Sequence, residues 1–131
     1  MSKDKPPETK KNLLLVVEDN PLLVGMYKSA FEKAGFSVVF AHDGKSGLEL
    51  AKTELPAVIL LDVLMPGMNG LDVLRELKKD PHTKDIRVMV LTVLYQEEIK
   101  KQAKELGADD FITKSELKLS EIVDKVLGYL K

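Results

Sequence analysis

Hydrophobic residues in this chain follow two patterns that alternate along its length. One pattern is a continuous apolar run of about five residues, which is typical of a strand buried on both faces. The other is an apolar residue at every third or fourth position, which is typical of a helix with one buried face. The runs predict strands at residues 13–17, 36–41, 57–62, 87–91 and 110–113. The periodic stretches predict helices between residues 20 and 35, 46 and 53, 69 and 80, 96 and 106, and 119 and 130.

Several helix boundaries carry their own signals. Asp19 or Asn20 can cap the first helix, with Pro21 near its first position, and Gly35 ends it. Asn69 is the expected cap of the third helix. The turn-forming residues between the elements therefore agree with the hydrophobic pattern.

Strict alternation of strands and helices with short connections predicts an α/β fold. Right-handed crossovers then give a parallel sheet with helices on both faces. We expect a doubly wound (βα)5 sandwich, and the strand order 2-1-3-4-5 suits a chain of 131 residues.

Length and composition indicate one folded domain at residues 13–131. Residues 1–12 carry four lysines, two acids and two prolines, so we expect them to form a flexible leader. The net charge of −1 gives no field that would favour direct nucleic-acid or membrane binding. With no cysteine and no apolar signal segment, we expect a cytoplasmic protein without disulfides or a sulfur-ligated zinc ion.

Polar residues follow four of the five predicted strands. Glu18 and Asp19 follow the first strand, Asp62 ends the third, Thr92 ends the fourth and Lys114 follows the fifth. Because parallel strands end at the same edge of a sheet, we expect these five side chains to lie together. A lone Asp after a strand is also a common turn residue, so the convergence of all five is what indicates a site.

The charges of this group favour phosphoryl-transfer chemistry. Three carboxylates about 5 Å apart repel one another by roughly 3 kcal/mol per pair at an effective dielectric constant near 20. A hard divalent cation, Mg²⁺ or alternatively Mn²⁺, would relieve that repulsion. Lys114 can pair with Asp62 and then with a phosphoryl oxygen, to which the Thr92 hydroxyl can also donate.

Residues 13–130 resemble the receiver domain of two-component response regulators, a flavodoxin-like fold, and are similar to the single-domain chemotaxis regulator. The motifs that carry the resemblance are Val17-Glu18-Asp19-Asn20, Leu61-Asp62-Val63-Leu64-Met65-Pro66-Gly67-Met68-Asn69-Gly70, Leu91-Thr92 and Gly107-Ala108-Asp109-Asp110-Phe111-Ile112-Thr113-Lys114. The resemblance implies that Asp62 accepts a phosphoryl group from a sensor histidine kinase or a phosphotransfer protein. It also implies that Glu18, Asp19, Asp62 and the backbone carbonyl of Leu64 surround Mg²⁺.

The resemblance further implies a conformational switch and no turnover chemistry. Thr92 would move toward the phosphoryl group, and Phe111 would turn into the space that Thr92 leaves. The surface of the fourth helix, fifth strand and fifth helix would then change shape. Since the chain ends one residue after Leu130, we expect the output to act on a separate downstream protein or a detached effector domain.

Three features depart from the family pattern. The family usually has proline after its lysine, where this chain has Ser115. A cis bond costs about 3 kcal/mol before serine and about 1 kcal/mol before proline, which leaves open whether Lys114–Ser115 is trans or strained. Val93 directly follows Thr92, at a position where the family often has a small residue. Leu64 and Leu94 stand where the family commonly has residues that orient the water for hydrolysis of the phosphoryl group, and leucine cannot orient water. We therefore predict a long-lived phosphoryl group.

Two other functions fit parts of the sequence. Ser115, Val93 and the apolar residues beside Asp62 also fit a degenerate receiver that binds proteins without phosphorylation. The other is an aspartate-nucleophile phosphatase on a similar sheet. Such enzymes typically carry a second acid two residues after the nucleophile, and Leu64 stands there instead, which argues against a free phosphatase.

Overall fold

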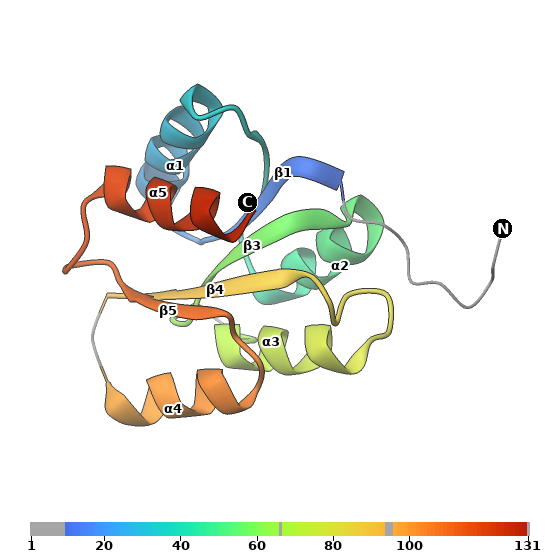
Figure 1. Cartoon of the computed structure of the whole chain (residues 1–131). Coiled ribbons are helices and arrows are strands. Elements are labelled where there is room, and N and C mark those ends of the chain that lie inside the picture. Colours follow the sequence, from blue (N-terminus) through green and yellow to red (C-terminus); the bar gives the residue numbers. More distant parts are fainter. Residues whose placement is uncertain (1–9, 66, 94–95, 131) are drawn as a thin grey trace, which may run out of the picture.

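The computed structural model describes residues 10–65, 67–93 and 96–130, and over that range strands and helices alternate (Figure 1). The strands are β1 (Lys10–Val17), β2 (Ser37–Ala41), β3 (Pro56–Asp62), β4 (Arg87–Thr92) and β5 (Asp110–Thr113). The helices are α1 (Pro21–Lys33), α2 (Gly44–Glu54), α3 (Gly70–Lys79), α4 (Glu97–Glu105) and α5 (Leu119–Tyr129).

The strands form one parallel sheet in the order β2-β1-β3-β4-β5, which confirms the predicted α/β fold and strand order. The register aligns Val17 with Leu61 and Asp62 with Leu91. Thr92 in turn pairs with Thr113, the residue before Lys114. The carboxyl ends of β1, β3, β4 and β5 therefore lie at one edge of the sheet.

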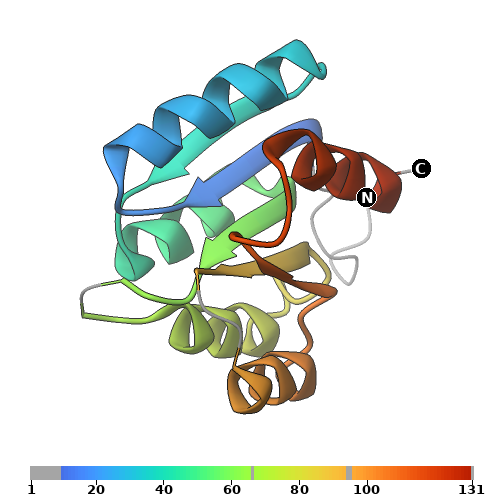
Figure 2. The same ribbon diagram turned by 90° about the vertical axis from the view of Figure 1, so that its left-hand side faces the viewer.

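Helices cover both faces of the sheet, with α1 and α5 on one face and α2, α3 and α4 on the other (Figure 1). Leu14 and Val16 of β1 pack into the core beneath α1 and α5, whereas Leu15 and Val17 pack into the core on the opposite face. This alternation is the pleat of a strand buried on both sides. Figure 2 shows α1 and α5 side by side above their face of the sheet.

Strand β1 begins at Lys10, three residues earlier than the hydrophobic pattern predicts. Lys10 aligns with Pro56 of β3, and the register shifts before Leu14. Asn12 has a positive φ of 64°, a conformation that asparagine tolerates better than most residues. Backbone pairing thus extends the strand into polar residues, so 10–12, assigned above to the leader, belong to the sheet. Residues 1–9 lie outside the described part.

Helix α2 also begins earlier than predicted, at Gly44, because Asp43 caps it. The Asp43 Oδ1 accepts a hydrogen bond of 2.8 Å from the Ser46 backbone N–H. Over residues 10–65, 67–93 and 96–130, none of the helices combines the length and the apolar character that crossing a membrane requires.

Candidate functional site

Asp62 is held at the end of β3 by the way the next helix begins. The backbone N–H of Gly70, the first residue of α3, donates to the Val63 carbonyl over 3.0 Å. A Cβ at position 70 would lie 2.3 Å from the Asp62 carbonyl oxygen, so only glycine allows this close approach. Asn69 and Asp72 form a capping box that fixes the start of α3. The Asp62 side chain is buried, and its Oδ1 accepts a bond of 3.2 Å from the Leu64 N–H.

Glu18 and Asp19 occupy the turn between β1 and α1. The Glu18 N–H donates to the Ala41 carbonyl over 3.0 Å, which extends the pairing of β1 with β2 by one bond. Glu18 is 1% exposed, and its Oε2 accepts a bond of 3.3 Å from the Asn20 N–H. The Asn20 side chain caps α1. Glu18 therefore faces the interior of the site while Asp19 remains exposed.

Lys114 bridges two of these acids. Its Nζ lies 2.5 Å from Glu18 Oε1 and 3.4 Å from Asp62 Oδ2. The Lys114 N–H donates to the Thr92 carbonyl over 2.7 Å, so backbone pairing aims the side chain across the ends of the strands. No cis peptide bond occurs in the described part of the chain, and Lys114–Ser115 is accordingly trans. The ammonium reaches both carboxylates without proline at position 115.

The three buried charges shift one another's protonation. Burial raises the pKa of Asp62 from 3.8 to about 7, and the hydrogen bond and charge of Glu18 add to that effect, while Lys114 opposes it. Burial also acts to raise the pKa of Glu18, but hydrogen bonds from Lys114 and Asp62 outweigh it, and the net shift is downward. Burial acts to lower the pKa of Lys114, yet both acids keep its net shift upward. Near neutral pH, Glu18 is thus a carboxylate and Asp62 lies close to its titration midpoint.

The acids fit a divalent metal. Glu18, Asp19 and Asp62 each offer a carboxylate oxygen, and these oxygens lie within 4.8 Å of one another. Oxygen donors of this kind suit Mg²⁺ or Mn²⁺. One ammonium against three acids leaves the cluster short of positive charge, and a cation is what would complete it.

Thr92 and Phe111 share a face of the sheet. Val90 and the partly buried Phe111 pack in the core beneath α2, α3 and α4, and they are aligned across β4 and β5. Thr92 follows Val90 by two residues, so the strand pleat places its buried side chain on that same face. Thr92 and Phe111 are therefore diagonal neighbours on adjacent strands.

Apolar side chains flank the acidic cluster. Leu64 is 55% exposed and Val93 is 46% exposed, both unusual for large apolar residues. The Val93 carbonyl lies 3.4 Å from the Ser115 hydroxyl, which ties together the loops after β4 and β5. Leu94, the second residue that we connect with phosphoryl lifetime, lies outside the described residues.

Two features of this site were not indicated by the sequence. Lys114 lies closer to Glu18 than to Asp62, whereas sequence reasoning paired it with Asp62 alone. Tyr27 of α1 is buried beside the charged group, and burial raises its pKa while Lys114 opposes that shift. The apolar spacing along α1 predicts a core position for Tyr27, but no residue pattern shows which core residue lies under the site.

The five-stranded parallel sheet, with a group of acids and a lysine at one of its edges, is the arrangement of a receiver domain. Residues 14–127 match the family model described as "Response regulator receiver domain". The chain belongs to this family, which serves two-component signalling and is not a family of turnover enzymes.

Individual relatives agree with that assignment. The chain is 40% identical over 101 residues to protein PilH of Pseudomonas aeruginosa, covering 77% of this chain and 84% of PilH. The structure of Vibrio cholerae chemotaxis protein CheY4 superposes with a TM-score of 0.82 at 26% identity, covering 91% of this chain and 98% of CheY4. The Mn²⁺-bound form of response regulator Rcp1 gives a TM-score of 0.76 at 26% identity, covering 89% of this chain and 90% of Rcp1. Other curated relatives are longer, and the chain spans 22% to 48% of their lengths.

Proposed function

We propose that this chain is a response-regulator receiver in which Asp62 accepts a phosphoryl group from a phosphohistidine of a sensor kinase or phosphotransfer protein. The observation that carries the proposal is the bridge from Lys114 Nζ to Glu18 and Asp62 at the carboxyl edge of the sheet. Asp62 lies at the end of a strand that both cores pack against, so its carboxylate is held in place before a phosphodonor arrives.

The transfer itself is a substitution at phosphorus. An Asp62 carboxylate oxygen forms the new P–O bond as the P–N bond of the phosphohistidine breaks, and the bonding electrons leave with the imidazole nitrogen. Lys114 is placed to neutralise charge on the phosphoryl oxygens, and the Thr92 hydroxyl to donate to one of them. Mg²⁺, or Mn²⁺ in its place, bound by Glu18, Asp19, Asp62 and the Leu64 carbonyl, would supply further charge neutralisation.

The proposed output is a change of the face formed by α4, β5 and α5. Movement of Thr92 toward the phosphoryl group would open space on the face of the sheet that it shares with Phe111. Phe111 contributes to a cavity of about 180 Å³ beside Lys100 and Lys104 of α4, so its rotation would alter that surface. A downstream protein or a detached effector domain would recognise the altered face, while the domain itself works in the cytoplasm.

The proposal is tested by intact mass after incubation with Mg²⁺ and a small phosphodonor such as acetyl phosphate. We expect one added phosphoryl group in the wild type and none in Asp62→Asn. The exposed Asp85 provides a matched control, since Asp85→Asn makes the same chemical change away from the site. Asp19→Asn and added chelator should each slow the gain of mass. Gain of mass in Asp62→Asn would refute Asp62 as the acceptor.

A second function, a receiver that binds a protein without phosphorylation, is favoured by the exposed Leu64 and Val93 beside the acceptor. No added mass from acetyl phosphate or from a phosphorylated histidine kinase would favour this alternative.

A further inference from the structure

Tyr27 places a hydroxyl group in the apolar core that lies beneath α1 and α5. It is 3% exposed and packs against Phe31, one turn later on α1, with the two ring centroids 6.4 Å apart. The other buried members of this core are aliphatic residues, methionine and phenylalanine. A buried tyrosine hydroxyl usually has a hydrogen-bonding partner. Over the described part of the chain, however, the Tyr27 hydroxyl forms no hydrogen bond with a protein group.

The strand pleat turns the charged side chains of the site toward the face on which Tyr27 lies. Three residues of the core that contains Tyr27 lie two positions before the charged residues, namely Val16 before Glu18, Leu60 before Asp62 and Ile112 before Lys114. Residues two positions apart in a strand point to the same face of the sheet. The two acids and the lysine therefore lie on the face that α1 and α5 cover.

Helix α1 directs the Tyr27 side chain toward these charges. The helix begins just after β1, at the sheet edge where Asp62 and Lys114 lie, and helical side chains lean toward the amino end of their helix. The charged groups that act electrostatically on the Tyr27 hydroxyl are Lys114, Glu18 and Asp62, with Lys114 first among them. Tyr27 acts in turn on the ammonium of Lys114. The hydroxyl and the ammonium are therefore neighbours within the site.

Lys114 has room for one more acceptor. An ammonium group carries three N–H donors, and the contacts with Glu18 Oε1 at 2.5 Å and Asp62 Oδ2 at 3.4 Å account for two of them. The Lys114 side chain is only 10% exposed, so water replaces a lost contact poorly. Glu18 is also one of the acids that would hold Mg²⁺, and a carboxylate shared with the metal attracts the ammonium less.

We propose that Tyr27 is a positioning residue for phosphoryl transfer, whose hydroxyl accepts a hydrogen bond from the Lys114 ammonium as Lys114 moves from Glu18 toward the phosphoryl group. This inference rests on the phosphoacceptor function proposed above. A hydroxyl is well suited to the task because it is neutral. A further carboxylate would hold Lys114 in competition with the phosphoryl oxygens, whereas a hydroxyl orients the ammonium and leaves its charge available to them.

Phosphorylation rates of variants that lack one hydroxyl test this inference. Tyr27→Phe keeps the ring and its packing against Phe31, and urea unfolding should show the fold retained. We expect it to slow the gain of phosphoryl mass from acetyl phosphate and Mg²⁺ roughly fivefold, the effect of one ordinary hydrogen bond. Tyr129→Phe is the matched control, since the Tyr129 hydroxyl donates to the Asp109 carbonyl over 2.9 Å, just before the start of β5. Equal rates for the two variants overturn the inference.

A rate effect that passes through Lys114 should disappear when Lys114 is replaced. Tyr27→Phe should slow the Lys114→Met variant no further, and the same fivefold slowing in that background overturns the positioning role. The NMR signal of the Tyr27 Cζ, which responds to hydrogen bonding of the hydroxyl, should move when Mg²⁺ is added to the wild type and should move much less in Lys114→Met. An unmoved signal in the wild type overturns the inference as well. A wild type that gains no phosphoryl mass instead contradicts the proposed function, and the Cζ signal then decides the contact between Tyr27 and Lys114.

Discussion

Replacing Asp62 with asparagine should stabilise the metal-free protein at alkaline pH. Asp62 is 4% exposed, and burial together with Glu18 raises its pKa from 3.8 to about 7. Between these two values the folded state binds a proton that the unfolded state releases. Stability is therefore lost as the pH rises from about 4 to about 7, and above pH 7 the full penalty of the ionised Asp62 remains. Asparagine fits the same space without a charge.

The magnitude follows from the same shift. A change in pKa from 3.8 to about 7 corresponds to roughly 4 kcal/mol above pH 7. Part of this is offset in the wild type, because the hydrogen bonds of Glu18 with Lys114 and with Asp62 outweigh burial and lower the pKa of Glu18. Asparagine keeps one hydrogen-bonding partner for Glu18 and loses the attraction of Lys114. We expect a net gain on the order of 2 kcal/mol in the free energy of unfolding at pH 8.

Urea unfolding in the presence of a chelator measures this gain. The difference between Asp62→Asn and the wild type should be largest at pH 8 and should shrink steadily toward pH 4. Asp85→Asn, in an exposed turn, should show no comparable pH-dependent gain. A variant no more stable than the wild type at pH 8, or a gain independent of pH, would refute the assignment of a buried, repelled carboxyl group at position 62.

Three further predictions concern neighbours of Asp62. Lys114→Met removes the cation that contacts two buried acids, and it should lower the free energy of unfolding by about 2–4 kcal/mol at pH 8 and by less at pH 5; equal urea midpoints would contradict this. Gly70→Ala places a Cβ 2.3 Å from the Asp62 carbonyl oxygen, so we expect a loss of more than about 2 kcal/mol in urea unfolding, whereas Gly25→Ala should be neutral or stabilising. Leu64→Asn introduces a group that can orient water, and it should shorten the half-life of phosphorylated protein, measured by loss of phosphoryl mass; an unchanged half-life would show that position 64 does not limit hydrolysis.

The fold was predictable because each strand is buried on both faces. Continuous apolar runs such as residues 57–61 leave little ambiguity about strand type, and turn residues such as Asn20 and Asn69 fix where the helices begin. Parallel pairing then brings Glu18 and Asp62 to the same edge. The position of the site on the sheet is thus a direct consequence of the order of strands and helices.

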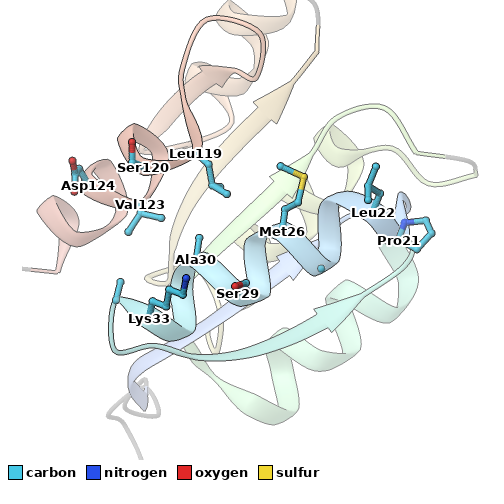
Figure 3. A pocket seen from close by; sticks show the side chains of 12 residues that line it. Pro21, Leu22, Met26, Ser29, Ala30, Lys33, Leu119, Ser120, Val123 and Asp124 are labelled. Atoms are coloured by element: carbon cyan, nitrogen blue, oxygen red, sulfur yellow. The ribbon is translucent and has the colours of Figure 1, made fainter.

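The pairing of charges within the site could not be predicted in the same way. Which acid lies nearest Lys114 depends on side-chain rotamers and on backbone bonds such as the one from Lys114 to the Thr92 carbonyl, and a one-dimensional pattern contains neither. The early start of β1 at Lys10 has a similar origin, because backbone pairing with Pro56 does not require apolar side chains. An apolar groove of about 890 Å³ also lies between α1 and α5 (Figure 3). Its space depends in part on the missing side chain of Gly25, and a hydropathy pattern does not reveal such a cavity.

The charge balance of the site links metal binding to folding stability. Lys114 offsets part of the repulsion among Glu18, Asp19 and Asp62, and a net negative charge remains. A ligand at about 100 times its dissociation constant stabilises a protein by about 2.7 kcal/mol, which is close to the net gain of about 2 kcal/mol that we expect for Asp62→Asn at pH 8. Mg²⁺ should therefore restore at pH 8 about the stability that the wild type loses relative to Asp62→Asn, and it should add little to Asp62→Asn itself. Titration of Mg²⁺ during urea unfolding would test this, and equal stabilisation of the two proteins would place the metal away from Asp62.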